Sequence, residues 1–431
     1  MYRSAIRIIN LCLILIFSGS VNAQLTIEIT GGAEGAVPIA IVPFVEDQGA
    51  EGVSKYVRGI IQADLERTGG FKSLALRDML SNPVDASQIK FRNWQALAQE
   101  NLVIGRVERV SAKNYIIEFR LFDVFKQQRL SGLRIPSSKS QLRRTAHKIA
   151  DIIYQTITGT PGVFSTRIAY VTVAQGKNKS RKYRLQVADA DGYNPQTILT
   201  SREPIMSPAW SADGSRIAYV SFEKKLSAVY IQTVSSGQRE LVASYPGING
   251  APAWSPDGRQ LALTLSKDGE PDIYILDIDS RSLRKLTRSY SIDTEPVWSP
   301  DGRSIVFTSD RGGKPQLYSV ALDGGTVRRL TFEGSYNAAA TLSPDGNLVA
   351  MVHRGGQGYQ IGVLDRSSGF FRVLTDGGLD EAPSFAPNGS MILYATRKGS
   401  QGQLSAVSVD GRVRQRLVLD AGEVQEPAWS P

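Results

Sequence analysis

Apolar and polar residues follow two different patterns along the chain, and the change of pattern divides it. From about residue 163 onward, short apolar runs alternate with polar turns, a pattern typical of β-strands. Many of these runs follow the same unit, which reads Pro-x-Trp-Ser-Pro-Asp-Gly in its fullest copies. Proline presets φ, aspartate can bond the following backbone and glycine accepts positive φ, so the unit predicts a tight reversal between two strands.

The unit recurs at a nearly constant interval. Its aromatic or leucine position advances by 44, 44, 44, 43 and 44 residues. The six positions are Trp210, Trp254, Trp298, Leu342, Phe385 and Trp429. This interval suits one four-stranded propeller blade and is longer than the shorter helical repeats. Six copies predict a six-bladed β-propeller over residues 163–431.

The two ends of the propeller region are incomplete and complement each other. If the strands of a blade are called A to D from the inside outward, residues 427–431 supply a strand A with nothing after it. Residues 167–171, 184–188 and 196–199 supply strands B, C and D with no strand A before them. We therefore expect one blade to be built from both ends, which leaves no open sheet edge.

The chain between residues 24 and 160 mixes apolar periods of two and of 3.6, which predicts a separate α/β domain. The expected elements are a buried strand, two helices, an antiparallel meander and a closing helix. They fall at 37–44, 52–67, 94–98, 102–110, 115–125, 129–135 and 142–157. Gly159, Pro161 and Gly162 interrupt both periods and predict a linker. The predicted fold class is an α/β N-terminal domain followed by an all-β six-bladed propeller with four-stranded blades, closed by the C-terminal strand.

Residues 1–23 have the pattern of a secretory signal peptide. Arg3 and Arg7 precede an apolar run at 8–17, and small residues lead to a cleavage site between Ala23 and Gln24. The run is short of the roughly 20 residues that span a bilayer. The single cysteine, Cys12, lies in this run, so we expect an exported mature protein without disulfides.

Composition adds a mild positive charge. The formal charge is +9, and removing Arg3 and Arg7 leaves +7. Basic residues cluster only at 177–184, which we interpret as a solvated loop. An exported protein seldom meets nucleic acid, so we expect no nucleic-acid partner.

Catalytic patterns are scarce. The chain has two histidines, His147 and His353, which excludes a histidine-rich metal site. It contains no Gly-x-Ser-x-Gly elbow and no phosphate-binding Gly-x-x-x-x-Gly-Lys-Ser/Thr loop. Asn388 replaces the repeated turn aspartate, which favours turn chemistry over catalysis there. We expect no enzyme, cofactor or metal; the alternative is a propeller-bearing hydrolase or polysaccharide lyase.

The loops that join strand D to the next strand A, here called the D–A loops, are polar and varied. Together with the B–C loops they should surround one mouth of the central channel. Apart from Arg202 their charges are mainly acidic, which suits a partner with basic and polar donors. The alternative is that these are solvated loops. The acidic residues are Glu203, Asp293, Glu295, Asp380, Glu381, Glu423 and Glu426.

An export signal, a small α/β domain and these blades, in this order, resemble the TolB family, the periplasmic propellers of the bacterial Tol-Pal system. The resemblance covers essentially the whole chain. Its more specific segments are Pro38-Ile39, Val42-Pro43-Phe44, Asn249-Gly250-Ala251-Pro252 and Thr294-Glu295-Pro296.

The resemblance implies a non-enzymatic, monomeric periplasmic adaptor that supports outer-membrane invagination during cell division and envelope integrity. It implies that the propeller mouth binds Pal, the peptidoglycan-associated lipoprotein, which makes the protein peripheral to the outer membrane, and that bacteriocins exploit the same surface. Ile248 stands where many members have a histidine. The implied Pal-binding residues are Met206, Ile248, Asn249, Gly250, Ala251, Thr294, Glu295, Tyr336, Asn337, Asp380 and Glu381.

The resemblance also implies that the mature N-terminus recruits TolA, the energised inner-membrane partner. Apolar and polar residues alternate in this segment, a pattern suited to adding an edge strand to a partner. The alternative is an ordinary first strand of its own domain. We further hypothesise that occupancy of the propeller shifts the segment between docked and free states. The implied residues are Gln24, Leu25, Thr26, Ile27, Glu28 and Ile29.

Overall fold

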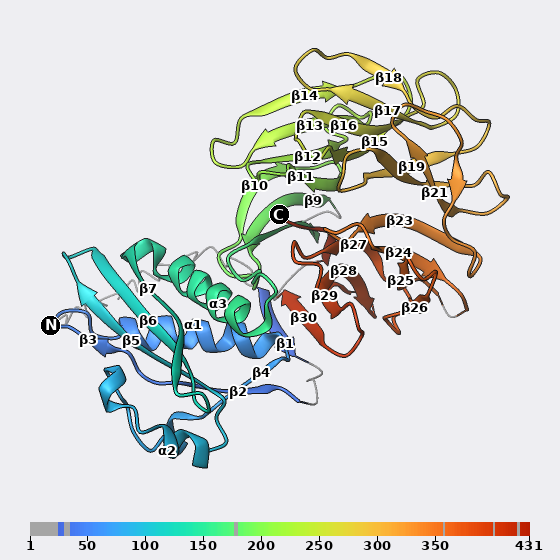
Figure 1. Cartoon of the computed structure of the whole chain (residues 1–431). Coiled ribbons are helices and arrows are strands. Elements are labelled where there is room, and N and C mark those ends of the chain that lie inside the picture. Colours follow the sequence, from blue (N-terminus) through green and yellow to red (C-terminus); the bar gives the residue numbers. More distant parts are fainter. Residues whose placement is uncertain (1–24, 30–34, 176–179, 357, 400, 420–422) are drawn as a thin grey trace, which may run out of the picture.

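Figure 1 shows the computed structural model of the chain, in which an α/β region lies beside a propeller. The structure describes residues 25–29, 35–175, 180–356, 358–399, 401–419 and 423–431. The predicted signal peptide, its cleavage site between Ala23 and Gln24, and Lys177 and Lys179 of the basic cluster lie outside these residues. The other basic residues of the cluster, Arg181, Lys182 and Arg184, lie on strand β9 (Arg181–Asp189), so the interpretation of 177–184 as a loop is wrong for them.

The α/β region contains one mixed sheet in the order β4-β2-β5-β6-β7, with β3 beside β5. Strand β2 runs parallel to β4 and β5, whereas β5, β6 and β7 form the predicted antiparallel meander. The strands are β2 (Val37–Ile41), β3 (Val45–Glu46), β4 (Phe71–Ser73), β5 (Asn101–Arg109), β6 (Asn114–Asp123) and β7 (Gln128–Ser138).

Helices cover this sheet because their apolar faces need a partner. Helices α1 and α3 pack on each other and share one core with β2, β5 and β6, and α2 belongs to a second core that contains Trp94. The helices are α1 (Val53–Arg67), α2 (Phe91–Ala96) and α3 (Leu142–Thr158), with short 3-10 turns η1 (Leu76–Asp78), η2 (Ala86–Gln88) and η3 (Lys139–Gln141). No helix that the structure describes is both long and apolar enough to cross a membrane.

The rest of the described chain forms six four-stranded blades, one of which gains a fifth strand, so the predicted propeller is confirmed. Four blades are continuous in sequence. They are β11 (Ile205–Trp210), β12 (Arg216–Ser221), β13 (Ala228–Thr233) and β14 (Arg239–Ala243); β15 (Asn249–Trp254), β16 (Gln260–Leu265), β17 (Asp272–Asp277) and β18 (Leu283–Lys285); β19 (Asp293–Trp298), β20 (Ser304–Ser309), β21 (Gln316–Ala321) and β22 (Arg328–Arg329); and β23 (Tyr336–Leu342), β24 (Leu348–Arg354), β25 (Gln360–Asp365) and β26 (Phe371–Val373).

The closing blade combines both ends of the propeller, as the repeat predicts. Its order is β10-β9-β8-β31, with Trp429 paired to Ile168. The backbone of Arg167 exchanges two hydrogen bonds with Ser430, at 2.8 and 2.9 Å. Its strands are β8 (Arg167–Gln175), β9 (Arg181–Asp189), β10 (Gln196–Ser201) and β31 (Glu423–Trp429).

The remaining blade carries the N-terminal segment as an extra outer strand. Strand β1 (Leu25–Ile29) pairs antiparallel with β30, from Leu25 opposite Leu419 to Ile29 opposite Gln415. The interpretation of this segment as the first strand of its own domain is therefore wrong, since it joins the propeller. Alternation of apolar residues predicts a strand but does not name the edge it joins. The blade strands are β27 (Glu381–Phe385), β28 (Met391–Lys398), β29 (Gln401–Ser408) and β30 (Arg414–Leu419).

The repeated unit forms hydrogen bonds both within its own turn and to the neighbouring blade. Ser211 donates its hydroxyl to Asp213 at 2.6 Å, and the amide of Arg216 donates to the same hydroxyl at 2.9 Å. The Ser211 hydroxyl, together with the hydroxyl and amide of Ser215, holds the pKa of Asp213 down at about 2. Trp254 donates its indole N–H to the carbonyl of Ala209 in the preceding blade at 3.0 Å. The turn interpretation of the aspartates is thus confirmed, and the tryptophans both pack and hydrogen-bond between blades.

Candidate binding site at the propeller mouth

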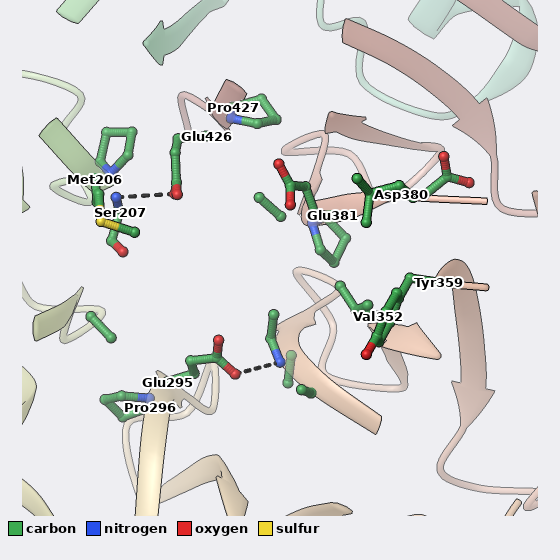
Figure 2. Close-up of a pocket in the computed structure, with 18 of the residues that line it drawn as sticks. Met206, Ser207, Glu295, Pro296, Val352, Tyr359, Asp380, Glu381, Glu426 and Pro427 are labelled. Carbon is green, nitrogen blue, oxygen red and sulfur yellow. Dashed lines mark hydrogen bonds between the residues drawn. The ribbon is translucent and has the colours of Figure 1, made fainter. Parts of the chain in front are cut away.

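A cavity of about 470 Å³ opens in the central channel, lined by all six inner strands (Figure 2). Each strand contributes the segment around its proline or the equivalent residue. Because every blade supplies one part of the wall, the cavity exists only in the closed ring.

The residue before the proline position has a left-handed backbone in all six inner strands. The register of each inner strand shifts across this residue, which marks a β-bulge. The left-handed region costs an L-residue about 1–2 kcal/mol, so the closed ring must hold these bulges in place. The six φ angles are 50° at Ser207, 46° at Ala251, 53° at Glu295, 51° at Ala339, 50° at Ala382 and 54° at Glu426.

Two of the bulge residues are glutamates that bind the bulge of the next blade. Glu295 accepts hydrogen bonds from the amide of Ala339 and the hydroxyl of Thr308, both at 2.8 Å. Glu426 accepts the amide of Ser207 at 3.1 Å (Figure 2). Each carboxylate therefore links two blades and adds negative charge to the cavity wall.

Glu426 has an unusual electrostatic setting. Burial raises its pKa, the amide of Ser207 opposes the rise, and the carboxylates of Glu381 and Glu295 add to it, giving a pKa of about 7. A group with this pKa changes charge near neutrality.

Six of the eleven predicted mouth residues line the cavity together. They are Met206, Ala251, Glu295, Tyr336, Asp380 and Glu381. Of the other five, Ile248 is 49% exposed, while Gly250 and Thr294 lie on β15 and β19 outside the lining. Ser207, Tyr359 and Leu379, which are not among the predicted mouth residues, also line the cavity. Tyr359 contacts Tyr336 edge to face, with ring centroids 5.2 Å apart.

Three of the predicted polar residues turn their side chains into the D–A loops. Asn249, Asn337 and Asp380 are at most 1% exposed. Asn249 exchanges hydrogen bonds with the backbone of Tyr245, Asn337 donates to the carbonyl of Glu333, and Asp380 accepts from two threonine hydroxyls. Their part in Pal binding stays a prediction, and in this structure their side chains hold the shape of the loops.

Fewer acidic residues contribute charge to the mouth than the sequences of the D–A loops predict. Asp293 is fully buried and paired with Arg311 at 2.8 Å, so it adds no free charge to the mouth. Asp380 is a lining residue whose carboxylate is bonded within its loop, so the carboxylates left to line the cavity are those of Glu295, Glu381 and Glu426. With the prolines and Tyr336 they form a recess that can accept hydrogen bonds from a protruding, donor-rich segment of a partner.

Within the described residues, one group of side chains has a spacing that could hold a metal ion. It consists of Asp64, His147 and Asp191, far from the mouth. Arg67 and Arg143 already pair with its two carboxylates, so we assign no metal to it.

Comparisons with known proteins cover both parts of the chain. The family model of the TolB β-propeller domain matches residues 154–431, and that of the TolB amino-terminal domain matches residues 25–130. A Tol-Pal system protein TolB from Nitrosococcus oceani is 53% identical over 237 residues, which are 55% of this chain and 54% of that protein. Another from Methylococcus capsulatus is 54% identical over 239 residues, 56% of this chain and 55% of that protein.

These alignments span about half the length of the curated relatives. A solved structure gives wider coverage. The crystal structure of TolB from Acinetobacter baumannii is 44% identical, with a TM-score of 0.88, over 95% of this chain and 100% of that chain.

Proposed function

The chain belongs to the TolB family of Tol-Pal system proteins, and from this premise we propose that it is a non-enzymatic periplasmic adaptor. We propose that the mouth binds Pal and that the mature N-terminus binds TolA. Through these partners the protein would support outer-membrane invagination and envelope integrity. It would act as a monomer held at the outer membrane by Pal, with a mouth that bacteriocins can also use.

The observation that carries this proposal is the recess formed by all six blades. It is concave, it combines carboxylates with apolar prolines, and Met206 at its edge is 40% exposed. A protein partner can bury an apolar tip there and satisfy the carboxylates with N–H donors. No specific feature of the described residues favours the hydrolase or lyase alternative.

The position of β1 supports a route for coupling between the two partner sites. One sheet runs β1-β30-β29-β28-β27, and β27 carries Glu381 and Ala382 of the cavity wall. A partner that shifts β27 acts on the same hydrogen-bonded sheet that holds β1. We propose that TolA competes for β1 and that Pal changes how firmly β1 is docked.

The first test is calorimetric titration of the protein from Gln24 onward with soluble Pal from the same organism. We expect saturable binding that Glu295→Lys or Ala251→Asp abolishes, because the first change reverses a charge on the cavity wall and the second adds one. The matched control is Glu240→Lys, on the outer strand β14, which should bind normally. A folded protein that binds no Pal, or Glu295→Lys and Ala251→Asp variants that still bind, would contradict the proposal.

The second test concerns the N-terminal segment, residues 24–35. Hydrogen exchange of residues 24–35 should change by several-fold when Pal binds, because docked strands are protected and free ones are not. A form lacking residues 24–35 should still bind Pal but lose TolA. Unchanged exchange on addition of Pal would rule out the coupling and leave the mouth assignment intact.

A further inference from the structure

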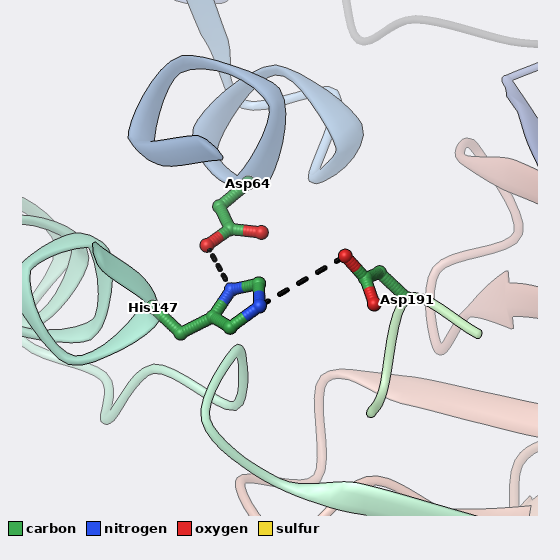
Figure 3. A group of neighbouring side chains, drawn as sticks. All are labelled: Asp64, His147 and Asp191. Atoms are coloured by element: carbon green, nitrogen blue, oxygen red, sulfur yellow. Dashed lines mark hydrogen bonds and ion pairs between the residues drawn. The ribbon is translucent and has the colours of Figure 1, made fainter. Parts of the chain in front are cut away.

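The α/β domain and the propeller meet at a small cluster of charged side chains (Figure 3). Asp64 lies on α1 and His147 on α3, whereas Asp191 lies in the turn between β9 and β10 of the propeller. The side chains of Asp64 and His147 are each 2% exposed, and that of Asp191 is 16% exposed. An imidazole is thus buried between a carboxylate of its own domain and one of the other domain.

The two ring nitrogens of His147 are not equally satisfied. Nδ1 lies 2.6 Å from Oδ2 of Asp64, a hydrogen bond. Nε2 lies 3.9 Å from Oδ2 of Asp191 and has no hydrogen-bond partner among the residues that the structure describes. A neutral ring that donates from Nδ1 points the Nε2 lone pair at a carboxylate, whereas a protonated ring points an N–H at it.

The surrounding charges leave room for one more positive charge. On α1, Arg67 lies 3.2 Å from Asp64, and on α3, Arg143 pairs with both Asp189 and Asp191. Asp151 lies one turn after His147 on α3, and Tyr193 of the propeller stacks under Arg143. Lys55 of α1 lines the open groove beside Asp64 and Asp191.

Three carboxylates, those of Asp64, Asp189 and Asp191, therefore face the two guanidinium groups of Arg67 and Arg143. One proton on His147 balances them. A divalent ion would have to displace a guanidinium.

We propose that His147 is a proton-operated clamp between the two domains. When protonated, its ring bridges Asp64 of the α/β domain and Asp191 of the propeller. When it loses the proton, the bridge to Asp191 is lost, while the ion pairs of Arg143 with Asp189 and Asp191 and other contacts between the domains remain. Docking is therefore stronger when the ring is protonated than when it is neutral.

The clamp is connected to strand β1 through a hydrogen bond between Arg67 and Gln415. Arg67, whose side chain pairs with Asp64, accepts a hydrogen bond at its carbonyl from Nε2 of Gln415 at 2.7 Å. Gln415 stands opposite Ile29 in the β1–β30 pair. Loosening the end of α1 should therefore weaken the support of β30 next to β1.

The experiment is hydrogen exchange of the full mature protein at pH 5.5 and pH 8.0, corrected for the intrinsic rates at each pH. Amides at the domain interface, such as those of residues 163–166 and 414–417, should exchange about fivefold to tenfold faster at pH 8.0, which corresponds to a loss of about 1 kcal/mol of docking free energy. His147→Gln should remove this difference. Asp191→Asn should reduce this difference, because asparagine has the shape of aspartate without its charge. Since Asp191 is less buried than His147, this variant replaces His147→Gln if that protein does not fold.

The control is His353→Gln, since His353 is the only other histidine of the chain and lies in the propeller. This variant should keep the pH difference at the interface. Equal exchange at both pH values in the wild type would overturn the proposal, as would a difference that persists in both His147→Gln and Asp191→Asn. Protection at pH 8.0 by added Zn²⁺ that depends on His147 would also overturn it, in favour of a metal site.

Discussion

At the scale of single residues, Glu426 gives the mouth a pH dependence. Its folded pKa of about 7 lies above the unfolded value of 4.5, so its contribution to stability is complete below pH 4.5 and is lost as the pH rises through 7. We expect Glu426→Gln to match the wild type at pH 5 and to be more stable by about 1–3 kcal/mol at pH 8.5. Chemical denaturation at the two pH values measures this.

Glu423→Gln is the matched control, because Glu423 is the first residue of β31 and lies outside the cavity lining. It should leave the difference between the two pH values as it is in the wild type. If the difference in unfolding free energy between Glu426→Gln and the wild type were the same at both pH values, the Glu426 carboxyl would not be desolvated in solution.

The sequence predicts the role of a side chain well where that side chain forms hydrogen bonds within its own turn. It predicts the role poorly where the orientation of the side chain depends on strands that are distant in sequence. The Ser-x-Asp-Gly unit belongs to the first kind, because Ser211, Asp213 and Arg216 are close in sequence. Asn249 and Asp380 belong to the second. Both are polar residues in polar loops, and only the packed structure shows that they face inward.

At the scale of elements, the bulge in each inner strand stores strain that can be measured. Ala382 has φ of 50° and precedes a proline, a position that normally takes an extended backbone. We expect Ala382→Gly to raise the free energy of unfolding by about 0.5–1 kcal/mol, because glycine accepts positive φ. Denaturant titration would show it as a shift of the midpoint without a change of slope.

Ala321→Gly gives the comparison. Ala321 is exposed at the end of β21 and has no positive φ, so the same change should lower the free energy of unfolding by about 0.5–1 kcal/mol. A loss of stability in Ala382→Gly as large as in Ala321→Gly would show that the bulge is unstrained.

The repeat predicted the strands because its period of two and its turn residues are local signals. It did not predict the bulges, although a proline inside an inner strand is a signal for them. Pro252 and Pro296 belong to the repeated unit, and each also restricts the backbone of the residue before it. The pairing of β1 with β30 has no local signal, since it joins residues almost 400 positions apart.

At the scale of the whole molecule, the closing blade determines whether the ring exists. Removing residues 427–431 deletes the Trp429 pairing, both Ser430 hydrogen bonds and the carbonyl of Ala428 that accepts the Trp210 indole. We expect the melting temperature to fall by roughly 10 °C or more. Differential scanning calorimetry measures it.

Pro431→Ala should leave the melting temperature unchanged, because Pro431 is exposed and lies beyond the last strand. A shortened protein that melts like the wild type would mean that the other blades hold the ring without β31.

The same blade sets the order of events when the chain first folds. Arg167 and Ser430 meet across 263 positions, and contacts of such high sequence separation form slowly. Strand β8 must keep an unpaired edge until β31 has been synthesised and has paired with it. During that interval the nascent propeller is a substrate for proteases and chaperones, so its yield in the cell should depend on the rate of this last step more than on the stability of the finished ring.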